Sequence, residues 1–397
     1  MAKNALYIQS GGPTAVINAS AYGVIQECQK HPDMIGRLYG AKHGVVGLKS
    51  DNLIDICALD QDQLSLLPQT PSMAFGSCRY RIPDAREDDT EYKKILDVFW
   101  KHDIGYIFYN GGNGTLCACM SLQKYLTGIG YDCKVMVIPK TVDNDIDCID
   151  HTPGYPSTAR HVAITVSELA HDIRSYNTGL ITVAEVMGRN TGWIAAAALA
   201  ACKDGNGPDL IYVPEVGFSP EKFLQDVRKV YDRKGRCLTV VAEGVKDDNG
   251  KYLFEYGMED AKNPDLNMGG IAPYLTSLLR KHFDCKIRGI DLGLMQRCAM
   301  HTASELDVRE AIRFGVRAVQ EALLGTSGKM VSLERISSRP YTVRETLADI
   351  AEAAGGGHPL PRAYITDDGN FIKDGFMDYL EPLIGEMPKY AKLNIVK

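Results

Sequence analysis

Short apolar runs that alternate with helix-patterned segments restrict the possible folds of this chain more than any other feature of its sequence. Apolar runs that read as strands cover residues 4–9, 104–110, 133–139, 179–186, 208–215, 236–243 and 285–292. Segments with apolar residues at helical spacing cover residues 13–29, 91–103, 113–126, 158–173, 194–202, 219–235 and 271–283. This alternation predicts an α/β fold with parallel sheets, in which ligands bind outside the carboxyl ends of the strands.

Two glycine-rich turns follow predicted strands and precede predicted helices. The first is SGGPT at residues 10–14, where Pro13 suits the first turn of the next helix, and the second is GGNGT at residues 111–115. Backbone N–H groups at a helix N-terminus attract phosphate, because they are unpaired and lie at the positive end of the helix dipole. Either turn could instead be a plain connection between a strand and a helix.

The turn PKTVDNDID, residues 139–147, gathers one lysine and three aspartates after a buried-looking strand. Crowded carboxylates repel one another unless a metal ion or a lysine offsets their charge, or one of them is held as a base. One aspartate could accept the proton of a substrate hydroxyl, and Lys140 could stabilise charge on a transferring phosphoryl group. The alternative is a solvated acidic loop whose aspartates cap the backbone.

Arginines in predicted loops are further candidates for anion binding. Arg189 ends the motif EVMGR, directly after a predicted strand, where a ligand can approach the backbone. Arginine suits bidentate binding of phosphate. Arg79, Arg288 and Arg297 occur in other loops, and each alone could be an ordinary surface charge. A phosphorylated substrate would need several of these arginines together.

Composition and charge argue against several classes of partner. The 397 residues carry a net charge of −6, which gives no reason to expect nucleic acid or an anionic membrane as a partner. No stretch approaches the roughly 20 apolar residues of a membrane helix, and the N-terminal segment lacks a signal-peptide pattern. The eleven cysteines form no C-x-x-C pair, which favours reduced thiols and predicts a cytoplasmic protein.

Taken together, the motifs resemble those of the phosphofructokinase family. The family order is followed by SGG, GSCR, GGNGT, PKTVDND, EVMGR, VVAEG and LMQR. The tail from Pro361 to Glu386 is similar to that of bacterial pyrophosphate-dependent members. The resemblance implies two Rossmann-like lobes with parallel-rich sheets and an active site in a cleft. It also implies transfer of a phosphoryl group, with Mg²⁺, from pyrophosphate to the 1-hydroxyl of fructose 6-phosphate.

The resemblance also divides the chain and assigns roles to its residues. Residues 1–150 would form the phosphoryl-donor lobe, completed by part of 295–397; residues 151–294 would form the sugar-phosphate lobe. Residues 295–397 would be a helical and C-terminal segment that packs on both lobes. Asp143 would be the base, with Lys140 and Arg189 as further catalytic residues. The residues expected to bind the sugar phosphate are Thr141, Val142, Asp145, Met187, Gly188, Glu243, Arg288, Leu294 and Arg297. Those expected to bind the phosphoryl donor are Gly11, Gly12, Arg79, Gly112, Gly114 and Thr115. A metal ligand is expected at Asn113, Asp143 or Asp145.

Two positions favour different phosphoryl donors. Lys140 is similar to family members that use pyrophosphate, whereas ATP users commonly have glycine there. Gly114 is similar to the ATP users, because pyrophosphate users typically carry an aspartate that blocks the nucleotide. The tail and the segment QSGGPTAVINAS favour pyrophosphate, which leaves ATP as the alternative donor.

Three departures from the family pattern keep a different function open. The usual metal-side aspartate is Asn113, a frequent Arg or Lys before the EVMGR strand is Leu180, and a frequent aromatic or His before the QR pair is Leu294. The alternative is therefore a low-activity or non-catalytic relative that binds phosphosugars. Family members often supply arginines across a subunit interface, so the resemblance also implies a homodimer or homotetramer.

Overall fold

The computed structural model describes residues 2–80, 82, 85–177, 179–257 and 270–391. The chain divides into two compact units, each of which is formed by two stretches of sequence. Unit 1 comprises residues 1–158 and 294–359, and unit 2 comprises residues 159–293 and 360–397. The segment after residue 294 is therefore shared between the units, and it contains two long strands as well as the expected helices.

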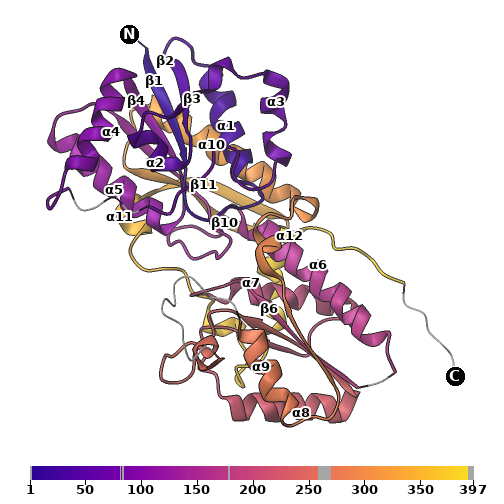
Figure 1. Ribbon diagram of the computed structural model, residues 1–397. Coiled ribbons are helices and arrows are strands. Elements are labelled where there is room, and N and C mark those ends of the chain that lie inside the picture. Colours follow the sequence, from indigo (N-terminus) through magenta and orange to yellow (C-terminus); the bar gives the residue numbers. More distant parts are fainter. Residues whose placement is uncertain (1, 81, 83–84, 178, 258–269, 392–397) are drawn as a thin grey trace. The chain divides into compact units, whose positions relative to one another are not determined.

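The centre of unit 1 is a seven-stranded sheet with the strand order β11-β10-β5-β4-β1-β2-β3 (Figure 1). Its strands are β1 (Lys3–Gln9), β2 (Ile35–Ala41), β3 (Leu53–Asp55), β4 (Ile104–Gly111), β5 (Lys134–Pro139), β10 (Lys329–Ser338) and β11 (Tyr341–Asp349). The five inner strands are parallel to one another, which confirms the predicted α/β class. The edge strands β3 and β11 are antiparallel to their neighbours. Sequence patterns predicted neither these two strands nor β2 and β10.

Helices cover the sheet of unit 1 on both faces (Figure 1). They are α1 (Ile17–Gln29), α2 (Gly44–Lys49), α3 (Gln61–Ser65), α4 (Thr90–Lys101), α5 (Asn113–Gly128), α10 (Glu305–Leu323) and α11 (Ile350–Ala353). Helices α1 and α10 touch backbone to backbone at two glycines. A Cβ atom on Gly23 would lie 2.0 Å from the carbonyl oxygen of Ile312, and one on Gly315 would lie 2.2 Å from that of Ser20. Only residues without a side chain allow this approach.

One predicted boundary in unit 1 is wrong. Pro13 was expected in the first turn of a helix, but α1 begins only at Ile17. The intervening residues stay outside the helix because Gly11 adopts a left-handed conformation with φ +81°, and the carbonyl of Gly12 accepts a hydrogen bond from Lys140. The glycine turn is thus longer than its sequence suggested.

Unit 2 contains a four-stranded, fully parallel sheet with the order β7-β8-β6-β9. Its strands are β6 (Leu180–Val186), β7 (Leu210–Tyr212), β8 (Arg236–Ala242) and β9 (Lys286–Asp291). Its helices are α6 (Tyr155–Arg174), which begins in unit 1, α7 (Trp193–Ala197), α8 (Pro220–Lys234), α9 (Ile271–Arg280) and α12 (Met377–Ile384). Helix α8 begins as predicted, because the Ser219 side chain accepts a hydrogen bond from the backbone N–H of Lys222.

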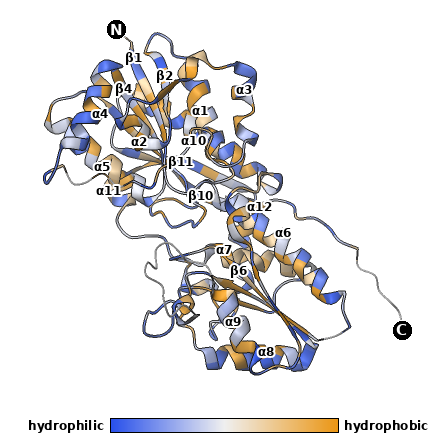
Figure 2. Ribbon diagram, in the orientation of Figure 1, coloured by the Kyte–Doolittle hydropathy of each residue, from blue (hydrophilic) through white to orange (hydrophobic). Residues whose placement is uncertain are grey.

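Apolar side chains fill the space between the sheets and their helices. Strand β6 is buried along its whole length, and Figure 2 shows it in hydrophobic colouring, whereas α8 carries hydrophilic residues on its outer side. This contrast is expected of a central parallel strand covered by amphipathic helices. Of the helices in the described ranges, none has the length and apolar character needed to span a membrane.

Candidate active site

The glycine turns and the acidic turn meet at one edge of the sheet in unit 1. Strands β1, β4 and β5 are parallel neighbours, so the loops after their carboxyl ends lie side by side. The Lys140 backbone N–H donates to the carbonyl of Gly111 at 3.0 Å, and its Nζ donates to the carbonyl of Gly12 at 2.7 Å. The Ser77 hydroxyl donates to the carbonyl of Gly11 at 2.7 Å, which adds the loop that carries Arg79.

Lys140 is the buried cation of this edge, with 3% of its surface exposed. Burial is the main cause that lowers its pKa, to about 8, and the charges of Arg297 and Arg79 act in the same direction. Asp143 and Asp145 oppose the shift. These five charged groups are therefore close enough to interact, with three positive and two negative charges when all are ionised. Such a surplus of positive charge suits a polyanionic ligand.

Helix α5 begins directly at this edge and presents its N-terminus there. Asn113 and Gly114 are its first two residues, so the GGNGT turn is a strand-to-helix connection as predicted. A Cβ atom on Gly111 would lie 1.9 Å from the Thr115 hydroxyl, whereas one on Gly114 would meet no atom within 4 Å. Gly111 is therefore needed for packing, and the space beside Gly114 is open. The helix dipole adds partial positive charge to the same edge.

Asn113 and Asp145 form a pair within this site. The Asn113 amide Nδ2 donates to Asp145 Oδ2 at 2.9 Å. Burial raises the pKa of Asp145, while hydrogen bonds from Thr141 and Asn113 act against that rise. The other carboxylate oxygen of Asp145, Oδ1, is buried and has no hydrogen-bond partner among the described residues. An aspartate at position 113 could not donate the hydrogen bond that the asparagine makes.

Arg297 and Leu294 lie in unit 1, on the 3-10 turn Gly293–Arg297. A Cβ atom on Gly12 would lie 3.5 Å from an Arg297 guanidinium nitrogen, which places this arginine beside the turn at residues 10–14. The turn is anchored by the Thr158 hydroxyl, which donates to the carbonyl of Gln296 at 2.7 Å. Leu294 is 64% exposed. Arg297 was expected to bind the sugar phosphate, and in unit 1 it lies with the residues expected to bind the donor.

A second group of expected residues meets in unit 2, after the neighbouring strands β6 and β8. The Glu243 backbone N–H donates to the carbonyl of Val186 at 2.8 Å, and that of Gly244 donates to the carbonyl of Gly188 at 3.1 Å. Gly188 has φ +127°, a conformation that side chains rarely allow. Met187, Gly188 and Arg189 therefore form one turn beside Glu243.

Three other residues of unit 2 that the sequence motifs singled out are buried or paired within the fold. Glu185, the first residue of EVMGR, accepts backbone hydrogen bonds at 2.9 Å from Gly270 and Ala272 and so caps α9. Leu180 is buried at the start of β6. Arg288 lies in the middle of the edge strand β9, where it binds the Asp172 carboxylate at 2.8 Å and stacks on Tyr176. It lies away from the carboxyl ends of β6 and β8.

Several residues around Asp143 were missed by sequence patterns. The Thr152 backbone N–H donates to the Asn144 side chain at 2.9 Å, and the Thr152 hydroxyl donates to the carbonyl of Thr141 at 2.9 Å. His151 contacts Glu310 on α10, and Ser157 contacts Asp307 one turn earlier. No local signal marks these residues, because a lone histidine and acidic residues on an amphipathic helix are usually read as surface groups.

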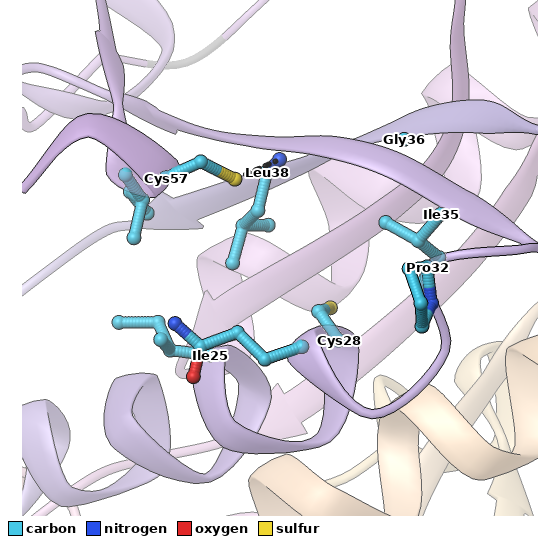
Figure 3. A pocket seen from close by; sticks show the side chains of 9 residues that line it. Ile25, Cys28, Pro32, Ile35, Gly36, Leu38 and Cys57 are labelled. Carbon is cyan, nitrogen blue, oxygen red and sulfur yellow. Dashed lines mark hydrogen bonds between the residues drawn. The ribbon is translucent and has the colours of Figure 1, made fainter.

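An apolar cavity of about 90 Å³ lies elsewhere in unit 1, between α1, β2 and the turn at Ile56–Ala58 (Figure 3). Its walls include Ile25, Ile35 and Leu38, with the thiols of Cys28 and Cys57, and none of the described residues that line it is charged. The cavity lies near the amino end of β2, away from the loops at the carboxyl ends of the strands. It lacks the groups that phosphate needs.

Known proteins share the sequence and the fold of the whole chain. The profile of the family described as Phosphofructokinase matches residues 4–322. A pyrophosphate–fructose 6-phosphate 1-phosphotransferase of Halomonas elongata is 39% identical, over 98% of this chain and 96% of the relative. A sulfofructose kinase of Alkalicoccus urumqiensis is 31% identical, over 96% of this chain and 95% of the relative. The crystal structure of a pyrophosphate-dependent phosphofructokinase from Nitrosospira multiformis superposes with a TM-score of 0.88 at 38% identity, covering 100% of this chain and 95% of that one. This chain belongs to the phosphofructokinase family.

Proposed function

We propose that this protein transfers a phosphoryl group from pyrophosphate to the 1-hydroxyl of fructose 6-phosphate, giving fructose 1,6-bisphosphate and phosphate. One observation carries the proposal: Lys140 and Arg297 lie beside the backbone of Gly12, Arg79 is close enough to act on the charge of Lys140, and the carboxylates of Asp143 and Asp145 act on the same lysine. Relatives that match nearly the full chain bear names of pyrophosphate-dependent enzymes, which supports the choice of donor.

The side chains of unit 1 supply positioning and charge neutralisation, which are the main contributions of proteins to phosphoryl transfer. In the proposed reaction Asp143 accepts the proton of the 1-hydroxyl as its oxygen attacks the terminal phosphorus of pyrophosphate. The P–O bond to the second phosphoryl group then breaks, and phosphate leaves. Lys140, Arg79 and Arg297 offset the negative charge of the pyrophosphate and of the leaving phosphate. In unit 2, the turn of Arg189 with Glu243 is proposed to bind the sugar phosphate.

The donor set of the loop fits Mg²⁺, the metal that the family implies. Asp145 has a buried carboxylate oxygen with no hydrogen-bond partner among the described residues, and Asp143 lies on the same turn. Mg²⁺ prefers such oxygens and is commonly held by one or two carboxylates together with substrate phosphates. When bound, it would neutralise charge on the transferring group. Within the described residues no cluster of three or more His, Cys, Asp or Glu could hold a metal alone.

The choice of donor depends on two positions in unit 1. Lys140 occupies the centre of the basic group and suits the compact charge of pyrophosphate. The open space beside Gly114 leaves room for a larger donor, so ATP remains the second donor to be tested.

The test is an activity assay with purified protein, fructose 6-phosphate and Mg²⁺, with either pyrophosphate or ATP as donor. Fructose 1,6-bisphosphate should form with pyrophosphate and at least about tenfold more slowly with ATP. The reverse reaction, with fructose 1,6-bisphosphate and phosphate, should release pyrophosphate. Product with ATP alone would replace the proposed donor. No product with either donor, together with calorimetric binding of fructose 6-phosphate, would support a non-catalytic sugar-phosphate binding protein instead.

A second acceptor is favoured by one specific observation. Leu180 and Leu294 are both apolar, whereas family members often carry Arg or Lys at the first position and an aromatic residue or His at the second. A sulfonate carries one negative charge where a phosphate carries close to two, and one full-length relative is named a sulfofructose kinase. The same assay with sulfofructose in place of fructose 6-phosphate distinguishes the two acceptors, because the better acceptor has the higher kcat/KM.

Assembly and location are further parts of the proposal. We propose a homodimer or homotetramer, because Arg288 lies on the edge strand of its sheet with part of its side chain exposed. Light scattering coupled to size exclusion would test this. All eleven cysteines are free, which suits the proposed cytoplasmic location.

A further inference from the structure

The loop that carries Asp143 is closed by hydrogen bonds with Thr152 and Pro153. The Thr152 hydroxyl donates to the carbonyl of Thr141 at 2.9 Å, and its backbone N–H donates to Asn144 Oδ1 at 2.9 Å. The Thr141 N–H in turn donates to the carbonyl of Pro153 at 3.3 Å. Asn144 has φ +54°, a left-handed conformation that asparagine tolerates better than most residues. Thr152 thus contacts the loop on both sides of Asp143, at the backbone of Thr141 and at the side chain of Asn144.

His151, the neighbour of Thr152, is held between two carboxylates. Its Nε2 lies 2.8 Å from Glu310 on α10, and its Nδ1 lies 2.8 Å from Asp150. The ring is 2% exposed. Each carboxylate has a further partner, since the Tyr341 hydroxyl donates to Glu310 at 2.8 Å and the Arg335 guanidinium donates to Asp150 at 2.8 Å. Both ring nitrogens face carboxylates, so both carry protons and the imidazole is a cation.

Asp307, one turn before Glu310 on α10, holds the end of the same segment. Its carboxylate accepts hydrogen bonds from the backbone N–H groups of Gly154 at 2.9 Å and Ser157 at 3.0 Å, and from the Ser157 hydroxyl at 2.5 Å. It is 1% exposed. These donors lie at the start of α6, so Asp307 caps one helix from another. The two α10 carboxylates, Asp307 and Glu310, therefore fix the segment that follows the Asp143 loop.

Such a buried polar network is a costly way to stabilise a fold, because well-packed apolar side chains often serve as well or better. Its members are all paired, however, and fully satisfied networks fix orientation. We propose that the α10 carboxylates act as positioning residues that set the orientation of Asp143 for phosphoryl transfer, Glu310 through His151 and Thr152, and Asp307 through the start of α6. This inference rests on the proposed function, in which Asp143 contacts the reacting hydroxyl.

The test compares two buried glutamates of the same helix. Glu310→Gln keeps the size of the side chain and removes the charge that holds His151. Glu321→Gln is the matched control, because Glu321 is 7% exposed and is paired with Arg317 and Thr326, not with the Asp143 loop. Glu310→Gln should lower kcat between about tenfold and hundredfold while the KM values of both substrates stay within about twofold. Glu321→Gln should leave kcat within about twofold.

A second pair of variants tests the route through Thr152. Thr152→Val removes the hydroxyl and should lower kcat, whereas Thr152→Ser keeps the hydroxyl and should restore it. If the effects share one route, the double variant Glu310→Gln with Thr152→Val should be no slower than the slower single variant. Multiplied losses would overturn the shared route. Thermal unfolding of each variant checks that the measured protein is folded.

Amide hydrogen exchange gives a readout that does not need activity. Exchange in residues 140–150 should become faster in Glu310→Gln than in Glu321→Gln, because the loop loses its support. Unchanged exchange and a kcat equal to that of the control would overturn the inference. A wild-type protein without turnover would refute the proposed function alone, since the exchange comparison would still decide whether the α10 carboxylates hold this loop.

Discussion

At the scale of single residues, Asn113 keeps one position beside the Asp145 carboxylate uncharged. Its amide donates to Asp145, where an aspartate would bring a second carboxylate and a repulsion. Asn113→Asp should therefore bind Mn²⁺, as a spectroscopic substitute for Mg²⁺, at least about tenfold more tightly in the absence of substrates, because one unit of negative charge is added close to the ion. Electron paramagnetic resonance of free Mn²⁺ measures this. Asn113→Ala removes the hydrogen bond without adding charge and should not bind more tightly; equal affinity in wild type and Asn113→Asp would contradict the prediction.

Lys140 is the residue whose charge should respond to pH. Burial lowers its pKa to about 8, so it is protonated below that pH and loses its charge above it. The value of kcat/KM for pyrophosphate should consequently fall above pH 8, by up to about tenfold per pH unit. In Lys140→Arg the cation persists, and the profile should fall less between pH 8 and 9.5 than that of the wild type, even if the maximum rate is lower. Ionisation of pyrophosphate itself is common to both proteins, so parallel profiles would show that Lys140 is not the titrating group.

At the scale of secondary structure, the start of α8 is determined by residues that are adjacent in the sequence. Ser219 accepts a hydrogen bond from the N–H of Lys222, and Pro220 occupies the first helical position. Ser219→Ala should lower the free energy of unfolding by roughly 1 kcal/mol, because a helix N–H loses its partner. Urea unfolding measures the change. Ser219→Asp keeps the cap and should retain most of the stability; a midpoint as low as that of the alanine variant would contradict capping as the cause.

The elements that could be predicted are those whose cause is local in sequence. The strands β1, β4 and β5 and their turns follow from apolar runs that end in glycine or aspartate, so Lys140 and Asp143 were identified together. The contacts of His151 with Glu310 and of Ser157 with Asp307 join residues about 150 positions apart. Their sequence patterns are those of ordinary amphipathic helices and loops, and only the packing of α10 brings them into contact. The edge strand β11, which pairs with β10, was missed because most of its side chains are polar and only partly buried, so that no apolar run marks it.

At the scale of the whole molecule, local and global charge differ in sign. The chain carries a net charge of −6, yet Arg79 and Arg297 form a basic group with Lys140 in unit 1. The three cations come from segments that are far apart in the sequence: the loop of Arg79, the acidic turn that carries Lys140 and the turn of Arg297. The net charge therefore gives no reason to expect nucleic acid as a partner, and it is compatible with the binding of a small polyanion.

The stability of the folded protein should depend on pH through His151. Burial alone would lower its pKa, but Glu310 and Asp150 outweigh burial and raise it to about 9, above the ordinary value of 6.5. A raised histidine pKa stabilises the fold fully below pH 6.5, and the contribution is lost as pH rises towards 9, by up to about 1.4 kcal/mol per pH unit. Asp307, with a pKa raised by burial to about 6, changes stability only below pH 6.5, and Lys140, whose pKa burial lowers to about 8, adds stability as pH rises only above about pH 8.

The interval from pH 6.5 to 8 therefore isolates His151 from these two groups. Denaturant unfolding across this interval should show stability falling with pH in the wild type, and the fall should be smaller in His151→Gln, which cannot take up the proton. Glu310→Gln should also flatten the slope, because the charge that raises the histidine pKa is gone. If wild type and both variants lose stability in parallel, the imidazole does not carry its proton in the folded state, and the charged form assigned to the network beneath the Asp143 loop is wrong.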